Sequence, residues 1–323
     1  MNPAARPVYT NYIALGEMID YLDGIRTGNI LPIRSAQRVE GFALIANAES
    51  EERQMIAATA LHVFALFIQL RRFEKDVSED MMAARSVQER TLLRDHPSCP
   101  GLDYDVIFRP AKMVSGDYYG VIRHQGSTTG FAVADVSGKG VPAALIMATI
   151  NTSLHDTMSK SGDGIGALMT RLHNIVFKAS PPARYATLVY ALYDADRNSL
   201  QYVNAGHQPA PILVRGSKIV ELEHGGPVLG LMENPIVPFG VGRVSLQPDD
   251  VIVIATDGVS DSVNAQGEMW GIESLHLACI EACGHRLKSA RSIADKIMKE
   301  ALRFCNDYPV QDDMTLMVLR VLK

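Results

Sequence analysis

Apolar residues recur at helical spacing over a long stretch in the first third of the chain. Residues 51–93 contain no glycine and no proline, and one row of apolar or small residues repeats every seven positions: Ile56, Val63, Leu70, Val77 and Ala84. A second row consists of Ala60, Phe67 and Met81 and is interrupted by Glu74. Heptad spacing is typical of a helix that packs against a second helix. It predicts one long helix, which either pairs with a second copy or packs on its own domain.

The segments on either side of this helix suggest the domain organisation. "YIALGEMIDYLDGI" (12–25) has helical spacing, whereas Gly28 and Pro32 interrupt the pattern that follows. We expect an all-α regulatory region over 1–52 and a linker or dimerisation helix over 53–96. "RDHPSCPG" (94–101) combines helix-breaking and turn residues and predicts the start of a new domain at residue 97.

Beyond residue 97 the pattern changes to short apolar strands separated by turn residues. Strand-like runs alternate with helical ones, and "YATLVYALYDADRNSLQYVNAG" (185–206) is a hairpin whose turn is "DADRNS". Two pairs of helices are predicted, one beginning with "PAALIMATINTSLHDTM" (142–158) and one with "SLHLACIEAC" (274–283). Antiparallel strands with helix pairs on their faces give an α+β fold. We therefore predict an α-β-β-α layered sandwich over 97–323.

Composition narrows the function classes. Of the 323 residues, 47% are hydrophobic, which suffices for a core, and the net charge of −5 comes without any long Lys/Arg run, which disfavours nucleic-acid binding. The most apolar segment (56–70) is too short to span a bilayer, which takes about 20 residues. Cys279 and Cys283, with His285 nearby, could form a metal site, and this alternative stays open. Reduced thiols are favoured because no CxxC pair occurs. We expect a cytoplasmic protein without a membrane span.

Acidic residues stand at the ends of several predicted strands. Asp117 lies in "SGDYY", Asp135 in "ADVSGKG", Asp257 in "ATDGVSD", and Asp312 and Asp313 in "QDDMT". Each alone is best explained as a turn residue, but carboxylates that converge on one rim repel each other and favour hard divalent cations. Two such ions can activate a water and hold a phosphate. Other catalytic motifs are absent: there is no GxSxG, and "SGKG" lacks the spacing of a phosphate-binding loop.

Seven motifs, in this order, resemble the metal-dependent PPM-type serine/threonine phosphatases, and more closely their bacterial SpoIIE/RsbU-type branch. They are "PAKMVSGDYY" (110–119), "FAVADVSGKGVPAALIMA" (131–148), "YATLVYALYD" (185–194), "YVNAGHQP" (202–209), "GGPVLGL" (225–231), "VIVIATDGVSD" (251–261) and "DDMTLMVLR" (312–320). The resemblance covers about residues 100–323. The helix end "AARSVQERTLL" (83–93) also resembles the amphipathic helix that precedes this domain in the branch.

The resemblance implies hydrolysis of phosphoserine or phosphothreonine on a protein, with two Mn²⁺ or Mg²⁺ ions. By motif, Asp135 corresponds to the acid that bridges both ions, and the carbonyl of Val136 completes one site. Asp117, Asp257 and Asp312 correspond to further acids at the ions, with Asp117 and Asp135 the residues most directly involved in catalysis. Asp313 stands where the wider class often has Asn, and we place it among the metal residues as a neighbour. A water activated by the ions would attack phosphorus in line with the leaving oxygen.

Two departures from the wider class concern the general acid and the phosphate contact. Ser137 stands two residues after Asp135, where the eukaryotic enzymes, which also have an Arg on an early strand, carry a His. His207 is a candidate for the general acid, although a turn-stabilising role is favoured. Lys139 could meet the substrate phosphate, although a place on the loop surface is favoured.

The branch also suggests the partners. Its typical substrate is a phosphorylated STAS-domain protein, an anti-sigma-factor antagonist, and its N-terminal region receives a signal from an activating protein. We therefore expect such a substrate, an activator at the N-terminal region and a homodimer. Two alternatives remain: a catalytically weak scaffold that binds a phosphoprotein, and a hydrolase of small phosphate esters.

Overall fold

The computed structural model places two compact units, Met1–Met82 and Ala83–Lys323. The residues that the structure describes are 28–35, 38–46, 51–92, 97–124, 126–160, 164–235, 237–284, 289–306 and 308–322. The division between the units falls inside the long helix, so its last ten or so residues belong to the second unit. The proposed boundaries at residues 52 and 96 remain predictions.

The first unit corrects the expectation of an all-α N-terminal region. β1 (Gly28–Ser35) and β2 (Arg38–Ala46) form an antiparallel hairpin, with an irregularity between Ile33 and Arg34. Proline lacks the N–H that a helix interior needs, so Pro32 favours an extended conformation over a helix in β1. The helix predicted over residues 12–25 lies outside the described residues.

The long helix is confirmed: α2 runs from Glu51 to Leu92, which matches the stretch without Gly or Pro (51–93) to one residue. The helix begins two residues before the expected range 53–96, and residues 93–96 lie outside the described residues. Apolar side chains in its middle are exposed, among them Phe67 (52%), Leu70 (54%) and Val77 (43%), which all belong to the predicted heptad rows. Among the described residues, no helix combines the length and the apolar character that a membrane crossing requires.

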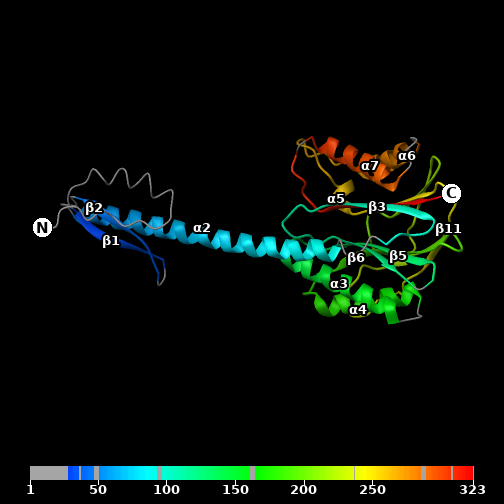
Figure 1. Ribbon diagram of the computed structural model, residues 1–323, viewed down its shortest axis with the longest axis horizontal. Coiled ribbons are helices and arrows are strands. Elements are labelled where there is room, and N and C mark those ends of the chain that lie inside the picture. The colour runs from blue at the N-terminus through cyan, green and yellow to red at the C-terminus, as the bar shows by residue number, and fades with distance from the viewer. Residues whose placement is uncertain are drawn as a thin grey trace. The chain divides into compact units, whose positions relative to one another are not determined.

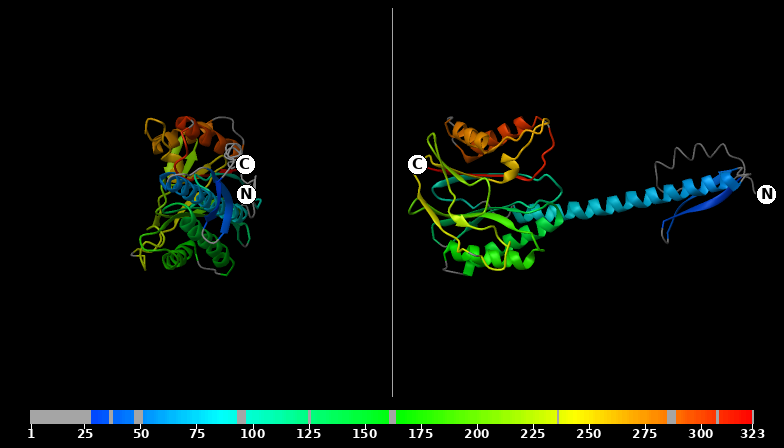
Figure 2. Two further views of the ribbon diagram at one scale, coloured as in Figure 1. Left: turned by 90° about the vertical axis from the view of Figure 1, so that its left-hand side faces the viewer. Right: turned by 180° about the vertical axis from the view of Figure 1, so that it is seen from behind.

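The second unit contains two antiparallel sheets (Figures 1 and 2). The first sheet has the order β10-β7-β6-β5-β4. The strand β11 also pairs with β7, antiparallel, whereas the short strand β10 pairs with β7 in parallel. Its strands are β4 (Tyr118–Arg123), β5 (Thr128–Val136), β6 (Ala186–Asp194), β7 (Ser199–Ala205), β10 (Gly225–Gly226) and β11 (Gly242–Ser245). The second sheet has the order β3-β13-β12-β8-β9. Its strands are β3 (Leu102–Arg109), β8 (Ile212–Arg215), β9 (Lys218–Glu221), β12 (Val251–Ala255) and β13 (Met314–Val321).

Helices cover the outer face of each sheet and complete the predicted α-β-β-α sandwich. α3 (Val141–Lys160) and α4 (Ile165–Ala179) lie on the first sheet, while α6 (Ile272–Gly284) and α7 (Ala290–Cys305) lie on the second (Figure 1). Because successive side chains of a strand point to opposite faces of the sheet, each strand contributes to two parts of the core. In β12, Ile252 and Ile254 pack in the larger cluster that includes the first sheet, whereas Val251 and Val253 pack with α6 and α7.

The strand directions bring four chain segments to one end of the sandwich. β4 begins where its antiparallel partner β5 ends, with Tyr118 opposite Ala134. β12 ends where β13 begins, with Ala255 opposite Leu316. A four-residue helix, α5 (Asp257–Ser260), follows β12 directly. The residues just outside these four strand ends therefore meet at the same edge.

Candidate metal centre

The predicted acids all lie at this end of the sandwich. Asp117 precedes β4, Asp135 is the second-last residue of β5, Asp257 opens α5, and Asp312 and Asp313 precede β13. Their charges interact: after burial, the neighbouring carboxylates of Asp257, Asp312 and Asp313 are the main causes that raise the pKa of Asp135 to about 7. The structure thus brings together residues that lie up to almost 200 positions apart in the sequence.

Asp117 is the most deeply buried of these acids, at 1% exposed. Its Oδ2 accepts hydrogen bonds from the Thr256 hydroxyl at 2.9 Å and the Thr315 hydroxyl at 2.5 Å. Burial, then the charge of Asp135, raise the pKa of Asp117 well above its usual range. Thr256, just after β12, and Thr315 of β13 therefore fix an acid that immediately precedes β4 of the first sheet.

The Asp257 carboxylate lies at the start of α5, where the backbone comes very close to β13. Burial, followed by the charges of Asp312 and Asp261, raise its pKa, while Lys139 acts in the opposite direction. A Cβ on Gly258 would stand 2.0 Å from the backbone oxygen of Asp313. Glycine at this position is what allows Asp257 to approach the other acids.

Asp313 holds the loop that carries Asp117. Its Oδ1 accepts from the Ala111 N–H at 2.7 Å, and its Oδ2 accepts from the Ser115 hydroxyl at 2.6 Å and the Gly116 N–H at 3.0 Å. Because three donors of one loop already occupy this carboxylate, the contacts favour a loop-positioning role beside the other acids.

The same loop is bound from the end of α2. The buried Gln88 side chain donates to the Ser115 carbonyl at 2.8 Å and accepts from the Ser115 N–H at 2.9 Å. The Ser115 hydroxyl accepts from the Asp117 N–H at 3.0 Å. A continuous hydrogen-bond chain therefore connects the helix to Asp117. Gln88 was not predicted as a site residue, although it lies within the helix-end motif (83–93).

Lys139 reaches the acids rather than lying free on the loop surface. Its ammonium lies 2.8 Å from Asp312 Oδ2 and donates to the Gln311 carbonyl at 2.7 Å. One residue earlier, Gly138 has φ +87°, and the Arg184 guanidinium lies where a Cβ would stand. Arg184 also donates to the Ser137 carbonyl at 2.6 Å, so it fixes the loop immediately after Val136. Neither contact was predicted.

His207 is enclosed and bridges the two sheets. Its Nε2 lies 3.0 Å from the Ala255 carbonyl, which can only accept, so Nε2 carries the proton and Nδ1 accepts from the Thr187 hydroxyl at 2.9 Å. Asn204 closes the turn through two hydrogen bonds to the His207 backbone. Burial lowers the pKa of His207 to about 4. These contacts support the turn-stabilising role over that of a general acid.

The donor set is suited to divalent cations. The acids that converge here offer carboxylate oxygens, which repel one another unless a cation lies among them. The Val136 carbonyl, next to Asp135 in β5, stays a predicted ligand. In the described part of the chain, no three acidic, histidine or cysteine side chains already converge as a preformed cage. Side-chain rotation and release of Asp312 from Lys139 would therefore accompany binding. The residues present fit Mn²⁺ or Mg²⁺ in donor chemistry.

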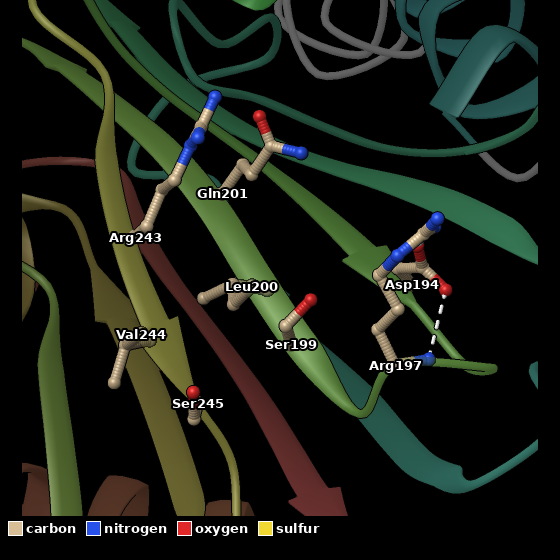
Figure 3. A pocket seen from close by; sticks show the side chains of 8 residues that line it. All are labelled: Asp194, Arg197, Ser199, Leu200, Gln201, Arg243, Val244 and Ser245. Carbon is tan, nitrogen blue, oxygen red and sulfur yellow. Dashed lines mark hydrogen bonds and ion pairs between the residues drawn. The ribbon is translucent and has the colours of Figure 1, made fainter.

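Two other candidate sites lack this chemistry. Burial raises the pKa of the Cys283 thiol to about 11, and Cys279 is fully buried, which agrees with inert thiols; His285 lies outside the described residues. A shallow cavity of about 390 Å³ beside β7 and β11 is lined by eight residues, none of them an acid of the centre (Figure 3). There Arg197 pairs with Asp194 at 2.6 Å.

Comparison with known proteins agrees with this geometry. The SiaA-PP2C domain of Pseudomonas aeruginosa superposes with a TM-score of 0.62 at 19% identity, over 76% of this chain and 98% of that one. The SpoIIE phosphatase domain with a regulatory fragment from Bacillus subtilis gives 0.54 at 19% identity, over 68% and 63%. The fold is that of the PP2C-type phosphatase domain, which confirms the predicted fold.

The family follows from the sequence match. The model described as Stage II sporulation protein E (SpoIIE) matches residues 125–322, and the chain belongs to this family. A curated relative, phosphoserine phosphatase RsbU of Bacillus subtilis, is 29% identical over 252 residues, which are 78% of this chain and 72% of that protein. Phosphoserine phosphatase RsbP of the same organism is 25% identical over 59% of this chain and 47% of its own length. The predicted SpoIIE/RsbU resemblance is thereby confirmed.

Proposed function

We propose that this protein is a metal-dependent protein-serine/threonine phosphatase that binds two Mn²⁺ or Mg²⁺ ions. The observation that carries the proposal is the convergence of Asp117, Asp135, Asp257 and Asp312 at one end of the sandwich. Burial and the neighbouring carboxylates raise the pKa values of the first three of these acids. Bound ions would offset this repulsion, activate a water and neutralise the phosphoryl group. A related phosphatase, RsbX, has a crystal structure in complex with magnesium.

The chain's own residues would act as follows. Asp135 and the Val136 carbonyl end β5 and would hold the ions at its tip, while Asp117, Asp257 and Asp312 would complete the ligand set. The Thr256 and Thr315 hydroxyls fix Asp117, and such partners of metal ligands typically tune metal affinity. Asp313 would position the Asp117 loop, and Lys139 would leave Asp312 as a cation binds.

The substrate we propose is a phosphoserine of a STAS-domain anti-sigma-factor antagonist. Dephosphorylation would allow this protein to bind an anti-sigma factor and release a sigma factor. The support is the similarity to RsbU and RsbP, both phosphoserine phosphatases, and the fold shared with the RsbU domain of Rv1364c from Mycobacterium tuberculosis, whose structure also contains an RsbW domain. We place the reaction in the cytoplasm, in keeping with four free cysteines.

We further propose that the N-terminal region regulates the site through α2, in a homodimer that receives an activating protein. Two observations support this. Exposed apolar side chains of the heptad rows would be covered by a second copy of α2, as in a coiled coil. The last turns of the helix contact the Asp117 loop through Gln88. A change in helix position would therefore change the position of an acid of the centre.

Phosphate release tests the proposal. The full chain would be incubated with a phosphoserine STAS-domain protein and with para-nitrophenyl phosphate, each with Mn²⁺ or with EDTA. We expect release with Mn²⁺ and none with EDTA. Release that persists in EDTA would refute the metal role. Binding of the phosphoprotein without hydrolysis of either substrate would refute the enzyme and favour a phosphoprotein-binding scaffold.

A further inference from the structure

A groove runs between α7 and β3, the edge strand of the second sheet. It consists of two adjoining cavities of about 370 and 340 Å³ that share Ile107 and Arg291. The larger cavity lies between the last residues of β3 and α7. The smaller one lies between β3, the end of α2 at Glu89 and Leu92, and Tyr119 of β4, with Arg291 of α7 beside it. In Figure 1 this is the upper, α7-covered side of the second unit. We call the two cavities together the α7–β3 groove.

The groove concentrates positive charge on an acidic protein. Arg291, Lys299 and Arg303 recur at multiples of four residues along α7, so they project from one face of the helix, and Arg109 faces them from β3. Arg291 pairs with Asp295 at 3.0 Å. Arg109, Lys299 and Arg303 make no ion pair among the described residues. Three uncompensated cations therefore line one cavity of a chain whose net charge is −5.

The floor of the groove is apolar. Ile107 and Leu302 pack partly buried against the core beneath α7, and Met298 is 2% exposed. In the adjoining cavity, Val106 and Phe108 turn to the opposite face of β3, toward the first sheet, so the apolar floor under α7 consists of Ile107, Met298 and Leu302. An apolar floor with a cationic rim suits a peptide segment that carries acidic side chains beside apolar ones.

One end of the groove lies next to the metal centre. Arg109 pairs with Met314 across the β3–β13 ladder, and Met314 directly follows Asp313. Beyond Arg109 the chain leads into the loop held by Asp313, which carries Asp117. The Arg109 end of the groove is therefore adjacent to the acids in the second sheet, and a phosphoprotein bound at the acids could reach it.

We propose that the α7–β3 groove docks an acidic segment of the phosphoprotein substrate. The inference rests on the proposed phosphatase activity and adds to it a recognition surface outside the metal centre. Charge complementarity selects the occupant: a segment rich in Asp and Glu matches the three uncompensated cations, and a small phosphate ester has no group that reaches them. Docking would lower the KM for the protein substrate and leave the chemical step unchanged.

The test compares two double variants of the full chain. Lys299→Glu/Arg303→Glu reverses two exposed charges of the groove that make no ion pair among the described residues. The matched control, Lys218→Glu/Arg243→Glu, makes the same change of net charge on β9 and β11, at strands that do not border the groove. Each protein would be assayed with a phosphoserine STAS-domain protein, with para-nitrophenyl phosphate, and for binding of a fluorescent poly-glutamate peptide.

We expect the groove variant to raise the KM for the phosphoprotein about tenfold at low salt with kcat unchanged, because charged rim residues govern encounter and its salt dependence. Para-nitrophenyl phosphate hydrolysis should be equal in all three proteins, and poly-glutamate should bind the wild type and the control only. Equal KM values in groove variant and control would overturn the docking role, as would a parallel loss with the small ester. If the wild type hydrolyses neither substrate, the proposed function fails, and peptide binding alone then decides for or against the groove.

Discussion

Replacement of Gln88 by leucine tests the connection between α2 and the acids. Gln88→Leu keeps the size of the side chain but removes both hydrogen bonds to Ser115, a fully buried residue. The Ser115 N–H and C=O would then lack their partner, at a cost of about 1–3 kcal/mol for each group. The loop can recover part of this cost only by moving, and movement displaces Asp117.

The expected effect is a weaker metal site in a folded protein. If the displaced loop weakens the free energy of Mn²⁺ binding by about 2 kcal/mol, Mn²⁺ affinity falls roughly 30-fold. This lies within the 10–100-fold range typical of residues that orient metal ligands. Calorimetric titration with Mn²⁺ gives the affinity, and the Mn²⁺ dependence of phosphate release gives the functional counterpart. Excess Mn²⁺ should restore most of the turnover.

A neighbouring substitution provides the control. Glu89 lies next to Gln88 on α2, but its side chain is half exposed and pairs with Arg85 on the surface at 2.8 Å. Surface pairs of this kind contribute about 0.2–1 kcal/mol, so Glu89→Gln should change Mn²⁺ affinity less than twofold. If Gln88→Leu binds Mn²⁺ and turns over as the wild type does, the hydrogen-bond chain does not transmit helix position, and the reasoning is wrong.

Further predictions concern the acids, Lys139 and α2. Asp135→Asn should abolish turnover yet raise the melting temperature of the metal-free protein, because it removes a repelled carboxylate; a lower melting temperature would count against the repulsion. Because the folded-state pKa of Asp135 is raised to about 7, its protonated form stabilises the metal-free fold below pH 4, and that contribution of roughly 2–4 kcal/mol is lost as pH rises through 7. Chemical denaturation from pH 5 to 8 should show this fall, and saturating Mn²⁺ should remove it. Lys139→Met should tighten Mn²⁺ binding several-fold in calorimetry because Asp312 loses its competing cation; weaker binding would mean that Lys139 positions Asp312. Leu70→Lys/Val77→Lys should convert a dimer to a monomer in analytical ultracentrifugation, whereas a monomeric wild type would exclude the α2 dimer.

The sequence was sufficient to locate the acids because each one breaks a local pattern. Asp135 and Asp257 end continuous runs of apolar residues, as expected of strands buried on both faces, and glycines follow both. Antiparallel order then implies a common edge. The length of α2 could also be predicted from the sequence, since its 42 residues contain neither glycine nor proline.

The supporting residues could not be located in this way. Thr256 and Thr315 are ordinary strand residues in sequence, and their contacts to Asp117 span 139 and 198 positions. Gln88 occupies a helix position where a polar residue normally faces solvent, and only the folded loop turns it into a buried partner. Contacts of this kind depend on tertiary packing, which local periodicity does not encode.

The N-terminal hairpin shows the opposite case. Residues 28–46 contain both the helix-breaking Pro32 and short apolar runs, and two strands alone are marginal in stability, so local preferences are weak. The prediction of a helical region over 1–52 extended the helical spacing of residues 12–25 past the break at Gly28 and Pro32, and this is why it was wrong for residues 28–46.

Mn²⁺ binding by the full chain tests the central claim most directly. Calorimetric titration of the wild type and of Asp135→Asn, both free of metal at the start, would report the number of ions and their affinities. Because paired metal sites of this chemistry hold two ions, we predict about two Mn²⁺ per wild-type chain and a loss of at least one in the variant. Identical isotherms for the two proteins, or no binding by the wild type, would contradict the assignment of the acid cluster as the metal centre.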